Sequence, residues 1–269
     1  MNIKIRFKAF AVHLLISALV VGAAMALTYG VWYRPPFAYA ENVATITLLL
    51  IAVDLVMGPL LTLIVYNPQK KSLRFDLALI GLVQVAALVY GMSTIYRARP
   101  VYAVYHDGRF ATATASAFQP DELAKVGKDS PYLPLPRLAP QWIGARVPPT
   151  LSESERDEIL TADVLGGGPR VMPRLYVPYA TVAPYALQRG KRADRIDYAR
   201  PQTRTGTNRM PPATRENLQE LLAELKKIGR PLDQLVLVPL HGSERWAIVV
   251  IDAKDGRILD SVNMQPFWF

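Results

Sequence analysis

Asp54 is the residue whose type and place in the sequence could do the most chemistry. It lies near the middle of an apolar run, residues 43–66, about 17 Å along a helix that starts at Val43. A carboxylate at that depth of a membrane costs about 2.5–3.5 kcal/mol on insertion scales. We therefore expect Asp54 to be protonated, paired or buried against a neighbouring helix.

Small and polar residues share one face of this helix with the acid. Their spacing places four residues on a single helical stripe: Thr47, Asp54, Gly58 and Thr62. Such a stripe is typical of a helix-packing face inside a membrane. Pro59 has no N–H to donate, so we expect the helix to kink just beyond Asp54.

A second polar residue lies at a similar depth in a third apolar run. Gln84 is about 14 Å along the helix of residues 75–96, and we hypothesise that it hydrogen-bonds to Asp54. Such a pair could hold the bundle together, form a docking site for a foreign membrane helix, or act in catalysis or proton relay. Ala87 and Gly91 add a small-xxx-small pair, which predicts a close helix contact.

Three long apolar runs occupy residues 1–96 of the chain. They cover about residues 10–32, 43–66 and 75–96, and each reaches the roughly 20 residues that cross a hydrocarbon core. Trp and Tyr side chains lie at their ends, where amphipathic rings favour the membrane interface. The sequence therefore predicts a three-helix transmembrane bundle.

Basic residues set the expected orientation of these spans. One cluster precedes the first span and another fills the loop between the second and third; the clusters are Lys4, Arg6, Lys8 and Lys70, Lys71, Arg74. Because positive charge favours the cytoplasmic side, we expect a cytoplasmic N-terminus and an outward-facing chain after Arg97.

The first span could instead be a signal peptide. Ala38-Tyr39-Ala40 fits a cleavage site, but the apolar run exceeds the roughly 7–15 residues of a signal core. We expect an uncleaved anchor. Cleavage would leave the other two spans in the same orientation.

Residues 97–269 are expected to form a small α+β domain with an antiparallel C-terminal meander. Helices are predicted near 121–126, 152–165 and 214–228, and strands within 101–114 and near 235–240, 246–252 and 257–262. The middle of the domain is rich in Pro and Arg, and it predicts irregular structure. The part that follows Pro169 and ends at Pro212 reads as a long exposed loop or a segment ordered by a partner.

The chain shows few residues for catalysis. It has no cysteine, which excludes disulfides, thiolate metal sites and cysteine nucleophiles. The three histidines, His13, His106 and His241, are scattered and read as unexceptional, and no phosphate-binding or serine-hydrolase motif is present. We expect no enzyme, no metal and no other cofactor. The net charge of +9 suits anionic lipid headgroups or an acidic partner, without a nucleic-acid recognition motif.

A set of short motifs lies between Asp54 and Phe110. It comprises Gly58-Pro59-Leu60-Leu61-Thr62-Leu63, Asn67-Pro68, Lys71-Ser72-Leu73, Phe75-Asp76-Leu77, Gln84, Tyr90-Gly91, and Arg99-Pro100-Val101-Tyr102 ahead of Arg109-Phe110. Together with the layout of three spans and a domain, this set resembles the TfpX/TfpZ family of type IV pilin accessory proteins.

The resemblance implies a multi-pass inner-membrane protein of a Gram-negative bacterium, with a periplasmic C-terminal domain, that assists type IV pilus production or assembly. The implied partner is the major pilin. Other pilus assembly proteins and the membrane lipid are further candidate partners. We hypothesise that the outward domain meets the pilin head and that polar and small residues of the spans hold the pilin helix: Asp54, Gly58, Pro59, Thr62, Gln84 and Gly91. The competing interpretations are a membrane-anchored sensory or ligand-binding module and a scaffold of a secretion complex.

Overall fold

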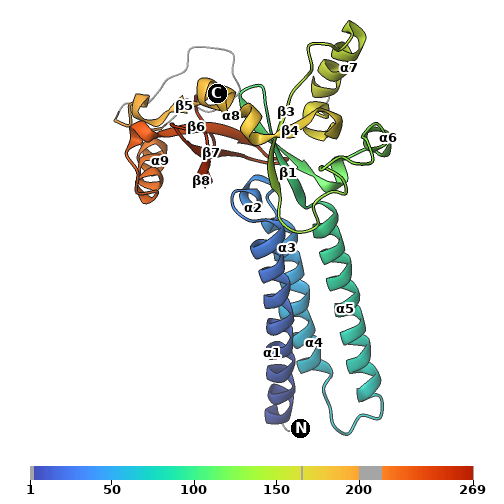
Figure 1. The fold of residues 1–269 in the computed structure, drawn as a ribbon. Coiled ribbons are helices and arrows are strands. Elements are labelled where there is room, and N and C mark those ends of the chain that lie inside the picture. The colour runs from blue at the N-terminus through green and yellow to red at the C-terminus, as the bar shows by residue number, and fades with distance from the viewer. Residues whose placement is uncertain (1–2, 165, 200–213, 269) are drawn as a thin grey trace. The chain divides into compact units, whose positions relative to one another are not determined.

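The computed structural model describes residues 3–164, 166–199 and 214–268 of the chain (Figure 1). The expected irregular segment that ends at Pro212 therefore lies partly outside the described residues. The chain divides into two compact units. The first comprises Met1–Arg34 and Val43–Arg99, and the second comprises Pro35–Asn42 and Pro100–Phe269. We call them the membrane bundle and the C-terminal domain.

The membrane bundle contains three helices that are long and apolar enough to cross a membrane: Ile3–Trp32, Ala44–Val65 and Leu73–Arg97. Their segments are α1 (Ile3–Leu27) with η1 (Thr28–Trp32), then α3 (Ala44–Ile51), η2 (Ala52–Met57) and α4 (Gly58–Val65), and finally α5 (Leu73–Arg97). The three predicted spans are confirmed as helices, and the first begins earlier than expected.

Small residues and aromatic rings hold the bundle together near one end. Gly91 of α5 packs against the Leu50 side chain of α3, as the small-xxx-small pair predicts. The Tyr33 hydroxyl donates to the carbonyl of Ile95 at 2.9 Å. At the start of α5, Asp76 pairs with Lys70 at 2.6 Å, so its ionic partner comes from the preceding loop.

The C-terminal domain is built on one mixed sheet with strand order β4-β3-β1-β2-β6-β7-β8, and β5 pairs with β6. The strands are β1 (Pro100–His106), β2 (Arg109–Thr114), β3 (Gln141–Ala145), β4 (Tyr176–Pro178), β5 (Lys191–Arg192), β6 (Leu235–His241), β7 (Trp246–Asp252) and β8 (Ile258–Val262). The expected antiparallel meander is confirmed in β6, β7 and β8. The pairs β1–β3 and β2–β6 are parallel, so the sheet is mixed. In both pairs the two strands come from distant parts of the chain.

Short helices accompany the sheet. They are α2 (Phe37–Ala40), α6 (Pro120–Ala124), α7 (Glu153–Val164), α8 (Tyr179–Arg189) and α9 (Arg215–Lys227). A capping box starts α7, where the Glu155 amide donates to the Ser152 hydroxyl and the Ser152 amide donates to the Glu155 carboxylate. Thr214 caps α9 by accepting from the Asn217 amide.

Alternate residues of β6 supply both faces of the sheet, as the period of a strand requires. Val236, Val238 and Leu240 enter the core with α8 and α2. Leu235 and Leu237 enter the core under α9. The sheet is thus buried on both sides along this strand.

The Pro-rich middle of the domain contains more regular structure than expected. β3 fits between Pro140 and Pro148, and α8 forms although Pro184 lies inside it. Irregular structure throughout this region was therefore the wrong expectation. Pro184 removes one hydrogen bond inside the helix, while the burial of Val182 and Ala186 of α8 offsets that loss.

The loop between the first two spans is part of the C-terminal domain. Phe37 and Ala40 are buried in the core of the sheet. The amides of Glu244 and Arg245 donate to the Ala40 carbonyl at 3.3 and 3.0 Å. Gly242 leaves the space for this loop, because a Cβ there would collide with the Ala40 backbone. This loop therefore belongs to the C-terminal domain and not to the membrane bundle.

Candidate functional site

Polar side chains from all three spans form one connected chain inside the membrane bundle. His13 of α1 contacts Thr62 of α4 through Nδ1, at 2.5 Å from Oγ1. Its Nε2 lies 2.8 Å from Oε1 of Gln84 in α5. The Gln84 amide nitrogen lies 3.0 Å from the backbone carbonyl of Asp54. These bonds tie the three apolar helices together at mid-depth.

The donors and acceptors in this chain can be assigned from its last contact. A carbonyl can only accept, so Gln84 must donate its NH₂ to Asp54 and present its oxygen to His13. We therefore assign an imidazole proton to Nε2, which donates to Gln84. The contact between Nδ1 and the Thr62 hydroxyl is compatible with either direction of donation.

The Asp54 carbonyl is free for Gln84 because of a π-helical turn. Gly58 donates its N–H to Val53 across five residues instead of to Asp54. In the π register the next donor would be Pro59, which has no N–H. The Gln84 side chain fills the missing bond, which is how membrane helices tolerate proline. The predicted disruption by Pro59 is thus found as the π turn of η2, in the segment that contains Asp54.

Gly58 provides the room for this contact. A Cβ at this position would collide with the amide group of Gln84. The predicted stripe is buried along its length, since Thr47, Asp54 and Thr62 are each less than 5% exposed. Thr47 also meets the Tyr29 hydroxyl of η1, with 2.8 Å between the oxygens.

The Asp54 carboxyl group has no such partner. The residue is 4% exposed, and within the described part of the chain neither carboxyl oxygen has a hydrogen-bond partner. The hypothesis that Asp54 and Gln84 hydrogen-bond is confirmed, and the group of Asp54 that accepts is the backbone carbonyl. An unsatisfied buried polar group costs about 1–3 kcal/mol.

A groove of about 160 Å³ opens beside this carboxyl group, and α1 and α5 form its walls. It is lined by His13, Ile16, Ser17, Val20, Asp54, Gly81, Gln84, Val85 and Leu88. The groove is mostly apolar, with Asp54, His13, Gln84 and Ser17 as its polar residues. Such a surface suits an apolar helix that carries a hydrogen-bonding group at mid-membrane depth.

The structure brings most of the candidate residues together. Asp54, Gly58, Thr62 and Gln84 lie close to one another, with Pro59 next to them. Gly91 lies apart and is already packed against Leu50 of the same chain. His13 was wrongly read as unexceptional: the expected start of the first span near residue 10 placed it close to the end of the span, whereas the helix starts at Ile3, which puts His13 about 15 Å along it.

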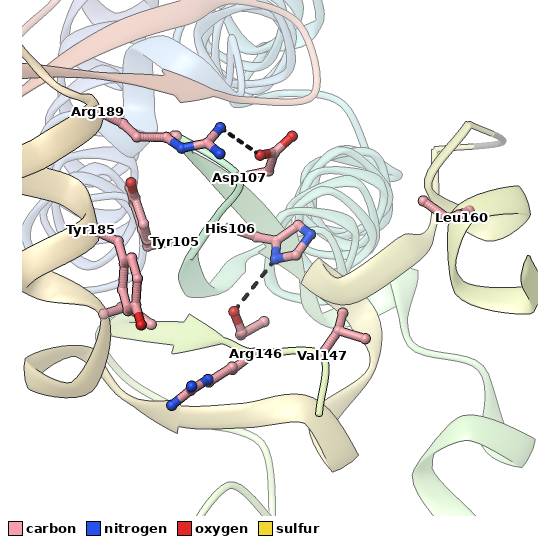
Figure 2. A pocket seen from close by; sticks show the side chains of 11 residues that line it. Tyr105, His106, Asp107, Arg146, Val147, Leu160, Tyr185 and Arg189 are labelled. Carbon is pink, nitrogen blue, oxygen red and sulfur yellow. Dashed lines mark hydrogen bonds and ion pairs between the residues drawn. The ribbon is translucent and has the colours of Figure 1, made fainter. Parts of the chain in front are cut away.

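The C-terminal domain holds two further cavities at the β1–β2 hairpin. The first has a volume of about 460 Å³ (Figure 2) and includes Tyr105, His106, Arg146, Tyr185 and Arg189 in its lining. The second, of about 400 Å³, is lined by His106, Arg109, Arg170 and His241 among others. In the described ranges no three His, Asp or Glu side chains converge in a metal-binding group.

Comparison with known proteins places the chain in a family. The family model described as "Fimbrial assembly protein FimB" matches residues 1–41. A protein of Dichelobacter nodosus named as the fimbrial assembly protein of serogroups C1 and C2 is 40% identical over 102 residues, which is 36% of this chain and 76% of the relative. The chain belongs to the fimbrial assembly protein family.

Other fimbrial assembly proteins match along almost the whole chain. Two from Dichelobacter nodosus, of serogroups I and E1, are each 28% identical over 268 residues, covering 97% of this chain and 95% of the relative. No solved structure matches the chain. The matches therefore span both the membrane bundle and the C-terminal domain. The family model covers His13 and the loop Pro35–Asn42 as far as Glu41.

Proposed function

We propose that this fimbrial assembly protein is an accessory protein of type IV fimbriae, of the TfpX/TfpZ group, that holds the major pilin before or during assembly. The groove beside Asp54 receives the membrane helix of the pilin. The C-terminal domain contacts the pilin head, and other assembly proteins join the complex. Family membership supports the fimbrial role, and the groove supports the mode of contact.

The unpaired carboxyl group of Asp54 carries this proposal. Gln84, His13 and Thr62 satisfy one another, whereas the Asp54 oxygens have no partner among the described residues. A helix that entered the groove with a donor at this depth would satisfy the acid and bury the apolar walls together. Interhelical hydrogen bonds of this kind are worth about 0.6–2 kcal/mol in membranes. A single hydrogen bond of this kind is thus weak, which suits a pilin that must be released for assembly.

The proposed orientation is an inner-membrane protein with its N-terminus in the cytoplasm and its C-terminal domain in the periplasm. Basic clusters before α1 and between α4 and α5 support it. The loop Pro35–Asn42 supports it as well, because this loop is part of the C-terminal domain and both must lie opposite the clusters. A pilin would then meet one contact in the membrane and one in the periplasm, which raises its effective affinity.

The proposal is tested in a strain that lacks this chain, complemented with the Asp54→Ala variant. We expect surface fimbriae and co-purified pilin to fall about tenfold, the change that corresponds to about 1.4 kcal/mol. Asp76→Ala is the matched control, because this carboxylate lies at the start of α5 and is paired with Lys70. Immunoblots must show equal amounts of both variants.

Normal fimbriation and normal pilin recovery with Asp54→Ala would contradict the membrane contact. The uncomplemented strain separates two forms of the role. Lost fimbriae with unchanged pilin indicate an assembly factor, and lost pilin indicates a chaperone. A strain with unchanged fimbriae and pilin would contradict the fimbrial role altogether.

A further inference from the structure

The two cavities of the C-terminal domain share one residue, His106, at the end of β1. We propose that they form one binding groove, the hairpin groove, for an acidic segment of a protein partner. This inference rests on the proposed function, in which that partner is the fimbrial subunit. Three observations support it: charge, fixed cationic side chains and exposed apolar anchors.

The first part of the hairpin groove combines aromatic and cationic groups. Figure 2 shows Tyr185 and Arg189 of α8 facing the β1 end, where Asp107 pairs with Arg189 at 2.9 Å. His106 lies between the two parts, and its Nδ1 is 3.4 Å from the carbonyl of Ala145. Arg146 follows β3 directly, and among the described residues it has no ion-pair partner.

The second part is dominated by a fixed arginine. The guanidinium of Arg170 donates to the carbonyl of Thr112 at 2.7 Å and to that of Gly166 at 2.5 and 3.0 Å. Carbonyl acceptors hold the guanidinium in place without neutralising its charge. Burial together with the charges of Arg109 and Arg170 lowers the pKa of His241, as expected in a positive field.

The charges of the whole groove are unbalanced. Four arginines line it against two carboxylates, Asp107 and Asp163. Each carboxylate already faces one arginine, at 2.9 Å for Asp107 and 3.9 Å for Asp163. The charge of Arg170 also acts on the Glu41 carboxyl, so Arg146 is the arginine that remains for a carboxylate that a partner brings. Such pairs give specificity and register to an interface.

Apolar side chains flank the same groove without being covered. Leu160 of α7 is 64% exposed and Val164 is 87% exposed, while Tyr185 of α8 is 47% exposed. Leu160 and Tyr185 line the first part, and Val164 lines the second. Uncovered apolar groups beside a charged cleft are typical of a protein interface. The segment that fits carries carboxylates next to apolar side chains.

The test uses the full chain in fimbriated cells with a photoreactive p-benzoylphenylalanine at one position. Tyr185 is the site in the groove, and Leu138, exposed and outside it, is the control site. Illumination is followed by immunoblotting for an adduct with the fimbrial subunit. We expect the adduct at position 185 and not at position 138.

Charge variants in the same background then test the chemistry. We expect Arg146→Glu to reduce the adduct at least about fivefold, the scale of a lost interfacial charge pair. Arg137→Glu, exposed and outside the groove, should leave it unchanged. Equal unfolding temperatures of the two variants exclude misfolding as the cause.

An adduct with lipid instead of the subunit would overturn the inference, as would equal adducts in Arg146→Glu and Arg137→Glu. A missing adduct at position 185, together with a persistent cross-link from the membrane groove to the subunit, would overturn the hairpin groove only. In that case the proposed function stands and the hairpin groove is not its periplasmic contact.

Discussion

The two units of the molecule treat a buried carboxylate in opposite ways. In the C-terminal domain Asp252 accepts from the Lys254 amide at 2.9 Å and from Arg230 at 2.5 Å, and these contacts lower its pKa. In the membrane bundle Asp54 is buried to a similar extent, yet its carboxyl oxygens have no partner in the described residues. This contrast agrees with our proposal that a partner helix enters the bundle beside Asp54.

The two units also differ in how completely their side chains are packed. The sheet core of the domain is closed by large side chains such as Phe110, which contacts the rings of Trp142 and Tyr179. In α5 the buried residues are Gly91 and Ile95 alone, so most of this helix faces lipid or a partner. A closed core should give large losses of stability on mutation, and an open bundle should give small ones.

Phe110→Ala should have the largest effect on stability. The side chain is 0% exposed, and truncating a buried phenylalanine costs about 3–5 kcal/mol. Chemical denaturation of the full chain in detergent, followed by tryptophan fluorescence, measures the loss. A cost below about 1 kcal/mol would break the comparison, because the domain core would then be as tolerant as a membrane surface.

Gly58→Ala should have an intermediate effect. The new methyl group displaces the Gln84 amide, and the bonds from Gln84 to His13 and Asp54 are lost at about 0.6–2 kcal/mol each. Gly81→Ala is the matched control, since a Cβ there meets nothing within 4 Å. Thermal unfolding of the bundle in detergent compares the two. Equal unfolding temperatures would show that the polar chain does not stabilise the bundle.

Glu41→Gln should change the stability of the fold least. It should stabilise the fold, whereas the two preceding variants destabilise it. Burial raises the pKa of Glu41, while hydrogen bonds from Ser243 act against the shift. A carboxyl with a raised folded pKa stabilises the fold fully below its unfolded value of 4.5, and this contribution is lost as pH rises through the folded pKa. The glutamine variant should therefore be more stable than the native chain at pH 7.

The pH dependence supplies the control for this variant. At pH 4 both side chains are neutral, so the two proteins should unfold at nearly the same temperature. A stabilisation that persists unchanged at pH 4 would mean that the ionisation of Glu41 is not its cause.

The sequence predicted most of what local patterns encode. The three spans and the helices near residues 152–165 and 214–228 follow from apolar periodicity and helix caps. The depths of Asp54 and Gln84 predicted that they meet. The π turn could not be predicted, because it depends on which carbonyl the Gly58 N–H selects next to Pro59, which has no N–H.

Contacts between distant parts of the chain also could not be predicted from the sequence. Nothing local in Pro35–Asn42 shows that Phe37 will lie in a core formed some two hundred residues later. β3 and α8 were missed because prolines surround or interrupt them, and the contacts that offset the prolines are tertiary. His13 and His106 each stand alone in the sequence, and their neighbours come from other helices and strands.

The groove beside Asp54 can be tested directly because the chain contains no cysteine. A single Gly81→Cys substitution places a thiol in the groove without a clash, and Leu82→Cys places one on the adjacent, exposed position. Each is oxidised in membranes against single cysteines placed along the membrane helix of the fimbrial subunit. We expect disulfide adducts with Gly81→Cys at helically spaced subunit positions and none with Leu82→Cys. Equal adducts from both positions, or none from Gly81→Cys while the native subunit still assembles, would contradict a groove that holds the subunit helix.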